Sequence, residues 1–449
     1  MNKLLKNILL TAFCLSLNFS SGCTTNDKNN TGEDDFTLVS TNPKEKATVS
    51  ASTNAVSFVF DKPVYVADKT KISLNGTPIS NTSATGSSLT VTLNLLVSET
   101  EYTVLIDIGA IKDSYNNLNK KAFTLHFSTE KKPEITSNLV MPNASAQAKK
   151  VYQFLLDNYG KKIISGAMAR VNWNTDEADR VYRWTGKYPA LNCFDYIHLQ
   201  YSPANWIDYG NTAVVEGWWN NGGLVMACWH WNVPATPGSD IDHYSFNTSG
   251  TTFDVSKAVQ DGTDENAVVK ADLEKVANYL LLLQAKNIPV IWRPLHEASG
   301  KWFWWGAKGA ELFKALWKLM FDTFKAKGIN NLIWVWTSQI NDPDWYPGDG
   351  YVDAIGCDIY TKPNVVDLVT PYQTLATRYP QKMITLSECG AVAAIPDQWN
   401  NGAQWSWFMP WYDYNATDDG TNIYATKEYW QNAFAFDKVI TRDKMPSLK

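Results

Sequence analysis

The order of apolar and polar residues divides the chain into two parts with different patterns. Between residues 36 and 130, short segments rich in Val, Thr and Ser alternate apolar and polar positions, with turn clusters such as "NGTP" and "SATGSS" between them. Several short alternating strands at close spacing are typical of a β-sandwich. The predicted strands are 55–60, 71–76, 88–93, 101–106 and 122–127.

From residue 138 onward, helical stretches alternate with short, continuous apolar runs. The predicted helices include 145–159, 268–286 and 309–327, and the eight apolar runs are 161–167, 188–196, 223–231, 288–297, 331–338, 352–360, 383–390 and 405–413. Such runs are typical of parallel strands covered by helices. Eight strand–helix units predict an α/β fold, a (β/α)8 barrel over residues 138–449. A doubly wound open sheet is the alternative, but no Gly-rich phosphate loop follows the first run.

The first residues form a segment of their own. Two lysines precede a largely apolar stretch, 8–19, and the small residues 20–22 lead to Cys23. This arrangement predicts a secretory signal, because the apolar stretch is too short to span a membrane. The ending Ser-Ser-Gly-Cys resembles a bacterial lipobox, which implies a lipoprotein signal peptide over 1–22, lipid attachment to Cys23 and export to the outer membrane. An ordinary cleaved signal is the alternative. Residues 23–35 are polar and predict a flexible tether.

Residues 40–64 resemble the bacterial immunoglobulin-like domains that precede secreted enzymes. The resemblance implies an immunoglobulin-like β-sandwich over residues 36–130, with "EKKPEI" (130–135) as the linker. All 20 tryptophans lie at or beyond Trp173, so this domain has none to stack on a sugar ring. We therefore expect a spacer rather than a carbohydrate-binding module.

Composition and charge narrow the class of protein. The 449 residues are 45% hydrophobic and 19% charged, which fits a globular protein of more than one domain. A net charge of −5 argues against nucleic-acid binding, which usually needs a basic face.

Beyond the export segment, the remaining cysteines stand far apart in apolar stretches and form no CxxC motif. They are Cys193, Cys228, Cys357 and Cys389. We expect buried free thiols; a disulfide between two of them is the alternative in an exported protein.

Reactive side chains gather at the ends of the predicted barrel strands, where the active site of such a barrel lies. The apolar beginnings of the same runs carry nothing reactive. The side chains at the ends are His230, the pair His296 and Glu297, Asp358 with Tyr360, Glu388, and Trp411.

Glu297 and Glu388 are the strongest candidates for catalysis. They end the fourth and seventh runs, across the barrel mouth from each other, and alternation places each on the inward face. Two carboxylates that flank a bond, one protonated and one ionised, are the machinery of glycoside hydrolysis, and a separation of about 5–5.5 Å gives retention of configuration. Trp302, Trp304 and Trp305 follow Glu297; their rings favour its neutral form and offer flat faces to sugars.

Arg293 shares the inward face with Glu297. A guanidinium is too costly to bury unpaired, so we expect Arg293 to form an ion pair with Asp358 or Glu388. A pair with Glu388 would hold that carboxylate ionised.

Other interpretations are weaker. A glutamate at a strand end is often a salt-bridged surface residue, but here the fourth and the seventh predicted strands both end in a glutamate. A metal site beginning at His296 is disfavoured, because "HEASG" has Gly300 where the HExxH motif needs its second histidine. Neither a metal nor another cofactor is therefore expected. Trp292 and "WVW" (334–336) are predicted to belong to the barrel core.

The motifs "WRPLHEASGKWFWWG" (292–306) and "LSECG" (386–390) resemble glycoside hydrolase family 26, chiefly endo-β-1,4-mannanases. The resemblance covers residues 140–449 and implies a (β/α)8 barrel with a retaining mechanism. Matched by motif, Glu297 is similar to the family's acid/base and Glu388 to its nucleophile.

The resemblance also implies substrate-binding residues. His296 takes the place of a family residue that contacts the sugar and the nucleophile, and Tyr360 is similar to a tyrosine that hydrogen-bonds the nucleophile. Trp302 and Trp411 correspond to aromatic residues that line the subsite next to the scissile bond. His230, in "WHWN", resembles a strand-end histidine near that sugar.

The family narrows the substrate to a class of polysaccharides. Most members cut mannan, glucomannan or galactomannan, and some cut mixed-linkage β-glucan or β-1,3-xylan. We expect cleavage of internal β-1,4-mannosidic bonds, with the insertion 232–265 walling one end of the cleft. A surface glycan-binding protein with an inactive barrel is the alternative from another class, and the pairing of two glutamates argues against it. The expected partners are a β-mannan-type polysaccharide and, through Cys23, a membrane.

Overall fold

The computed structural model describes residues 35–449 apart from 52, 94–95, 132–133, 171–172, 200–206, 241 and 418. The predicted signal peptide, Cys23 and the tether up to residue 34 lie outside the described residues. Contacts divide the chain into two compact units, and Thr129–Lys449 belong to the second. Among the residues that the structure describes, none of the helices combines the length and the apolar character needed to cross a membrane.

The first unit is built from strands that form two main sheets. Its strands are β1 Leu38–Asn42, β2 Ala47–Val49, β3 Ala55–Phe60, β4 Tyr65–Val66, β5 Ile72–Leu74, β6 Thr77–Pro78, β7 Thr82–Thr85, β8 Ser88–Thr92, β9 Glu101–Ile106, β10 Ile111–Lys112 and β11 Phe123–Thr129. They pair in the orders β1-β3-β8-β7 and β2-β11-β9-β5-β6, and β4 pairs with β10. The rings of Phe60 and Phe123 meet edge to face at 5.0 Å and link the two sheets. The predicted β-sandwich is confirmed.

In the second unit, eight parallel strands close into a barrel. They are β12 Ile163–Met168, β13 Leu191–Asp195, β14 Leu224–Trp229, β17 Val290–Pro294, β18 Leu332–Ser338, β19 Ala354–Lys362, β20 Met383–Val392 and β21 Trp407–Pro410. Neighbours in this order are hydrogen-bonded, and β12 pairs with both β13 and β21, which closes the ring. A further strand, β22 (Val439–Ile440), pairs with β12. Each predicted apolar run overlaps one barrel strand, so the predicted (β/α)8 fold is confirmed.

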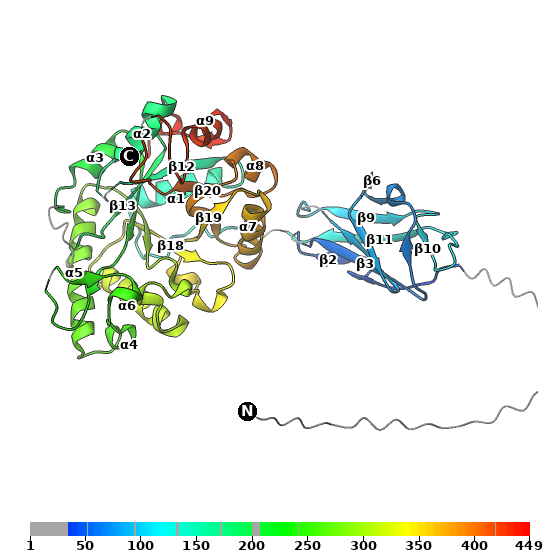
Figure 1. Cartoon of the computed structure of the whole chain (residues 1–449), viewed down its shortest axis with the longest axis horizontal. Coiled ribbons are helices and arrows are strands. Elements are labelled where there is room, and N and C mark those ends of the chain that lie inside the picture. The colour runs from blue at the N-terminus through cyan, green and yellow to red at the C-terminus, as the bar shows by residue number, and fades with distance from the viewer. Residues whose placement is uncertain are drawn as a thin grey trace, which may run out of the picture. The chain divides into compact units, whose positions relative to one another are not determined.

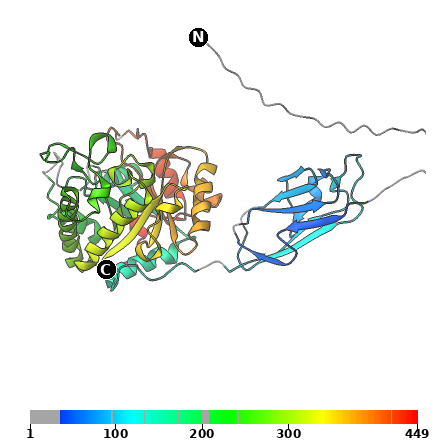
Figure 2. The same ribbon diagram turned by 90° about the horizontal axis from the view of Figure 1, so that it is seen from below.

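Helices surround the strands of this unit, as Figure 1 and the turned view in Figure 2 show. They are α1 Ala146–Asn158, α2 Asp176–Thr185, α3 Ala213–Asn220, α4 Val255–Ala258, α5 Asp264–Ala285, α6 Ala310–Ala326, α7 Val366–Arg378, α8 Ile395–Asn400 and α9 Lys427–Ala435. Ser145 caps α1 by accepting a hydrogen bond from the backbone N–H of Ala148. In α6, Phe313, Trp317 and Met320 recur at helical spacing and are buried, so one face of the helix packs inward.

The fourth barrel strand ends earlier than the sequence predicts. β17 stops at Pro294, so His296 and Glu297 lie in the loop beyond the strand and not at its tip. Leu295 and Glu297 both have left-handed backbone angles, with φ of 49° and 52°. Strand alternation therefore does not direct the Glu297 side chain; a strained turn does. Non-glycine residues adopt this conformation at a cost, and such strain clusters at active sites.

The insertion 232–265 contacts the loop that carries Trp302. The insertion begins with a short hairpin of β15 (Val233–Pro234) and β16 (Tyr244–Ser245). The backbone N–H of Thr248 donates to the carbonyl of Trp302 at 2.8 Å. The insertion thereby holds the Trp302 loop in place.

Other predicted core positions are confirmed. Trp292 and both tryptophans of "WVW", Trp334 and Trp336, are at most 1% exposed. The four cysteines of the second unit are free and buried, as expected.

Candidate active site

Glu297 and Glu388 come together at the carboxyl ends of the strands. One carboxylate oxygen of each lies within 4.8 Å of the other, and of an oxygen of Asp358. Glu388 is buried within β20, whereas Glu297, in the loop after β17, is half-buried. Carboxyl groups that act with inversion stand about 6.5–9.5 Å apart to admit a water molecule, so this closer spacing fits retention.

Both oxygens of Glu388 have a polar neighbour. The hydroxyl of Tyr360 donates to Oε1 at 2.5 Å, and Nη2 of Arg293 lies 3.0 Å from Oε2. Burial raises the pKa of Glu388, and the Arg293 guanidinium and the Tyr360 hydroxyl act in the opposite direction. These two groups favour the ionised carboxylate.

Arg293 is fully buried and joins several residues. Its guanidinium forms ion pairs with both Asp358 and Glu388, and its Nε donates to Oγ1 of Thr337 at 3.1 Å. The hydroxyl of Ser387 donates to Oδ1 of Asp358 at 2.7 Å. The sequence predicted one of the two ion pairs, and the structure contains both, because a single guanidinium can serve two buried carboxylates.

Glu297 has a less polar environment. Its Oε2 accepts a hydrogen bond from Nε1 of Trp302 at 3.1 Å. Burial and, after it, the negative charge of Glu388 raise the pKa of Glu297 to about 7. The site therefore holds one carboxyl group whose pKa lies near neutrality, poised to give or take a proton, beside another whose ionised form Arg293 and Tyr360 favour.

The tryptophans of the loop after Glu297 have different environments. Trp302 is 43% exposed, so its ring is open to a ligand. Trp304 and Trp305 are fully buried, and their N–H groups donate to the carbonyls of Trp231 and His296 at 2.7 and 2.9 Å. The prediction that all three offer faces to sugars is therefore wrong for Trp304 and Trp305, which support the loop from within.

Two histidines and Trp411 meet at the same end of the barrel. The ring of His230, which follows β14, lies 4.5 Å from the ring of His296 and 5.6 Å from that of Trp411, centroid to centroid. Burial lowers the pKa of His296 well below its usual value, and the positive charge of Arg293 acts in the same direction. His296 is therefore neutral. The histidines predicted from strand ends thus share one wall with Trp411.

Asp195, the last residue of β13, is not among the residues predicted from sequence. It is buried, and its Oδ2 lies 2.5 Å from Nδ1 of His230. The second apolar run, "YPALNCFDY", also carries an acidic residue near its end. The strand-end signal that pointed to Glu388 was therefore present for Asp195 as well.

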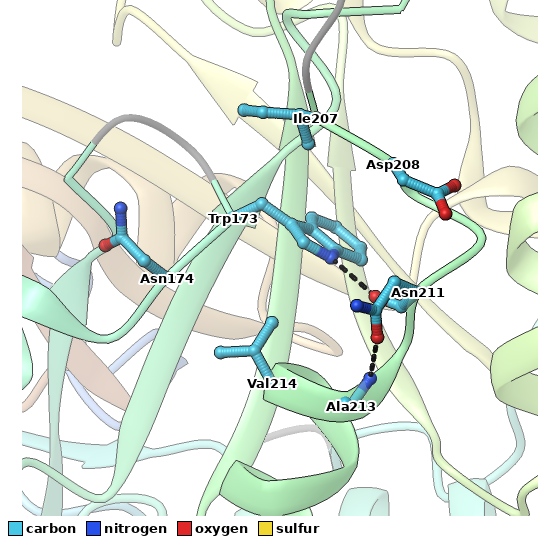
Figure 3. Close-up of a pocket in the computed structure, with 7 residues that line it drawn as sticks. All are labelled: Trp173, Asn174, Ile207, Asp208, Asn211, Ala213 and Val214. Carbon is cyan, nitrogen blue, oxygen red and sulfur yellow. Dashed lines mark hydrogen bonds between the residues drawn. The ribbon is translucent and has the colours of Figure 1, made fainter.

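A separate hollow lies among the loops that follow β12 and β13. It has a volume of about 510 Å³ and is lined by Trp173, Asn174, Ile207, Asp208, Asn211, Ala213 and Val214. The indole of Trp173 stands at its centre and donates to the carbonyl of Asn211 at 3.1 Å (Figure 3). These loops leave the carboxyl ends of their strands, so the hollow lies at the same end of the barrel as the glutamate pair. Neither Glu297 nor Glu388 is among the residues that line it.

Both units resemble known families. A sequence model described as "Glycosyl hydrolase family 26" matches residues 140–440, and one described as "Bacterial Ig-like domain" matches residues 32–129. The second match agrees with the immunoglobulin-like domain expected from sequence.

Solved structures and a curated relative agree with the first match. The GH26 domain of an endo-beta-mannanase/endo-beta-glucanase from Prevotella bryantii is 41% identical, with a TM-score of 0.65 over 70% of this chain and 100% of that domain. A beta-mannanase from a symbiotic protist of the termite Reticulitermes speratus, solved with a gluco-manno-oligosaccharide, is 38% identical, with a TM-score of 0.62 over 70% of this chain and 98% of that one. The mannan endo-1,4-beta-mannosidase of Thermothelomyces thermophilus is 38% identical over 70% of this chain, which spans 64% of that relative's length. The chain belongs to glycosyl hydrolase family 26.

Proposed function

We propose that the chain is a retaining endo-β-1,4-mannanase that cuts internal bonds of mannan, galactomannan or glucomannan. The observation that carries this proposal is the pair Glu297 and Glu388, whose carboxylate oxygens lie within 4.8 Å of each other. The spacing supports a double displacement. The relatives named as mannan endo-1,4-beta-mannosidases and the neighbour solved with a gluco-manno-oligosaccharide support the substrate class.

In the proposed first step, the ionised carboxylate of Glu388 attacks the anomeric carbon and the bond to the leaving oxygen breaks. Glu297 gives its proton to that oxygen, so the leaving sugar departs as an alcohol. In the second step, Glu297 takes a proton from a water molecule, which displaces Glu388 and restores both carboxyl groups. The two inversions leave the configuration of the sugar unchanged.

The neighbouring side chains have proposed roles in binding. Trp302 and Trp411 line the subsites beside the scissile bond, and Trp302 also fixes Glu297 through its N–H. His230 and His296 contact the sugar that is bound next to Glu388. Tyr360 orients the carboxylate of Glu388 through its hydroxyl. Arg293 and Asp358 support the nucleophile from within the barrel through their ion pair.

A panel of polysaccharides tests this function. Purified protein is incubated with mannan, galactomannan, glucomannan, mixed-linkage β-glucan and β-1,3-xylan, and product sizes are followed over time. We expect manno-oligosaccharides of mixed length from the first three substrates, with the newly formed reducing end initially in the β configuration by NMR. Exclusive cleavage of β-glucan or xylan would favour those alternatives, and binding without release of reducing sugar would favour a glycan-binding protein. The Glu297→Ala/Glu388→Ala double variant controls for contaminating hydrolases.

We also propose that the protein is exported and anchored to the outer membrane by a lipid on Cys23, with the immunoglobulin-like domain as a spacer. The support is the Ser-Ser-Gly-Cys ending after an apolar stretch, together with the polar residues 24–35. Radiolabelled palmitate should enter the native protein, which should partition with detergent. A Cys23→Ser variant that labels equally would contradict the anchor.

A further inference from the structure

Asp195 and His230 form a buried pair behind the proposed sugar-binding wall. Oδ2 of Asp195 lies 2.5 Å from Nδ1 of His230, and Oδ1 accepts the backbone N–H of the same histidine at 3.1 Å. The Asp195 side chain is 1% exposed and that of His230 is 10% exposed. The aspartate therefore fixes both the ring and the backbone of His230, and the other ring nitrogen, Nε2, points away from Asp195.

The ring of His230 is enclosed by aromatic groups. Its centroid lies 5.2 Å from that of Phe246, 5.9 Å from that of Phe303 and 5.6 Å from that of Trp411. Phe246 comes from the 232–265 insertion, so aromatic groups from three separate segments close around one imidazole. A positive charge on that ring is shielded from water, and Asp195 is the anion in direct contact with it.

The ionisable groups that face His230 form a defined set. The Cys228 sulfur lies within 4.8 Å of both Asp195 and His230, and burial raises the pKa of this thiol, so it is uncharged. Glu297 and Glu388 are also within electrostatic reach, and the charge of His230 lowers the pKa of each. Burial lowers the pKa of His230, but the charge and the hydrogen bond of Asp195, with a further contribution from Cys228, keep it well above its usual value.

The neighbouring histidine shows the opposite behaviour. His296 is 1% exposed, and its Nδ1 has no hydrogen-bond partner among the described residues. Burial, Arg293 and His230 all lower the pKa of His296. The two imidazoles, which meet edge to face at 75°, therefore carry different charges, because only one of them has an aspartate.

We propose that Asp195 is a positioning residue for the glycosidase reaction: it holds His230 as a permanent imidazolium whose Nε2–H is a fixed donor to the bound sugar and whose charge helps to keep Glu388 ionised. This inference rests on the proposed function for its catalytic consequence, but the charge of His230 can be measured without any substrate.

The direct test is a pH titration of the histidine ring nitrogens by NMR. The chain has only five histidines, so ¹⁵N labelling of histidine gives a resolvable spectrum, and His230→Gln assigns the signal. We expect both ring nitrogens of His230 to stay protonated from about pH 5 to 9, and the ring in the Asp195→Asn variant to lose its charge below about pH 6.5, because burial then lowers the pKa unopposed by Asp195. A His230 that titrates near 6.5 in the native protein would overturn the proposal. So would a signal that changes after dialysis against EDTA, because the nitrogen would then hold a metal ion in place of its proton.

Asp195→Asn also has a kinetic signature. The amide keeps the size of the side chain, but it offers one acceptor oxygen in place of two and carries no charge. We expect kcat/KM on manno-oligosaccharides to fall about 10- to 100-fold. Both limbs of the pH profile should move to higher pH, because the loss of the cation raises the pKa of Glu388 and that of Glu297.

Asp272→Asn is the matched control. Asp272, in α5, is equally buried, and its Oδ2 accepts from Nε1 of Trp231 at 2.8 Å, one residue beyond His230. It should lower the melting temperature without moving either limb of the pH profile. If both variants change only the melting temperature, Asp195 is a structural residue and the proposal fails. If neither the native chain nor Asp272→Asn hydrolyses any polysaccharide while His230 still stays charged, the proposed function fails and the charge assignment stands.

Discussion

The hydroxyl of Tyr360 donates a 2.5 Å hydrogen bond to Oε1 of Glu388, whose other oxygen lies 3.0 Å from Nη2 of Arg293. Tyr360 lies on β19 and Glu388 on the neighbouring strand β20, where the two strands pair. One carboxylate is thus held at both oxygens by groups from two other strands. A nucleophile fixed in this way loses little entropy when it attacks.

Replacing Tyr360 by Phe should slow hydrolysis while leaving the fold intact. A hydrogen bond to a charged group contributes about 1.5–3 kcal/mol, which corresponds to roughly a 10- to 100-fold loss in kcat. The hydroxyl lowers the pKa of Glu388, so the acidic limb of the pH profile should also move upward. Tyr346→Phe, which removes a hydroxyl bonded to Asp349, is the control. Equal rates for both variants would contradict a role for Tyr360 at the nucleophile.

Replacing Glu297 by Ala should remove the acid/base without removing the nucleophile. Activity on mannan should fall by about 10²- to 10⁴-fold, because a sugar alcohol leaves poorly without a proton. An aryl manno-oligosaccharide with an acidic phenol should still react, and added azide should raise its turnover. The absence of an azide effect would count against the acid/base assignment.

The native pH profile should show the titration of Glu297. Its pKa, raised to about 7 by burial and the nearby Glu388 charge, means that the carboxyl is protonated below that pH and ionised above it. As a proton donor it is competent only in the first form, so kcat/KM should fall as the pH rises through about 7. Initial rates on a soluble manno-oligosaccharide measure this limb. The limb should disappear in Glu297→Ala with an aryl substrate; its persistence there would assign it to another group.

Gly300 should be intolerant of a side chain, because a Cβ there would lie 2.1 Å from the Trp302 ring. Trp302 is 43% exposed, so its indole can move outward at little cost in stability. We expect Gly300→Ala to raise KM about 3- to 10-fold, as the loss of an aromatic contact would, with little change in melting temperature. Gly217→Ala is the control, because nothing lies within 4 Å of the added methyl. An unchanged KM would show that Trp302 does not bind substrate.

Much of this architecture could be predicted from the sequence, because it follows from burial. A parallel barrel strand is covered on both faces, so each strand appears as an unbroken apolar run, and runs such as 383–390 reveal both the strand and its reactive end. The ion pairs of Arg293 follow from the same reasoning, since a buried guanidinium needs carboxylates.

The details that depend on distant segments could not be predicted. Nothing in "PLHE" marks Leu295 and Glu297 for left-handed angles, because neither is Gly or Asn, the usual residues there. Trp302 and Trp304 look alike in the sequence, but Trp304 donates to the carbonyl of Trp231, 73 positions away, and is buried. The pairing of Asp195 with His230 likewise needs the register of β13 against β14.

In the proposed mechanism Glu388 forms the bond to the sugar and Glu297 does not. The most direct measurement is the configuration of the glycosyl azide that Glu388→Ala makes from an aryl β-manno-oligosaccharide, determined by NMR. Azide that takes the place of the missing carboxylate attacks the anomeric carbon from the side of Glu388, with a single inversion, so we expect the α-azide. Formation of the β-azide, or hydrolysis of mannan by this variant at the native rate, would contradict this mechanism.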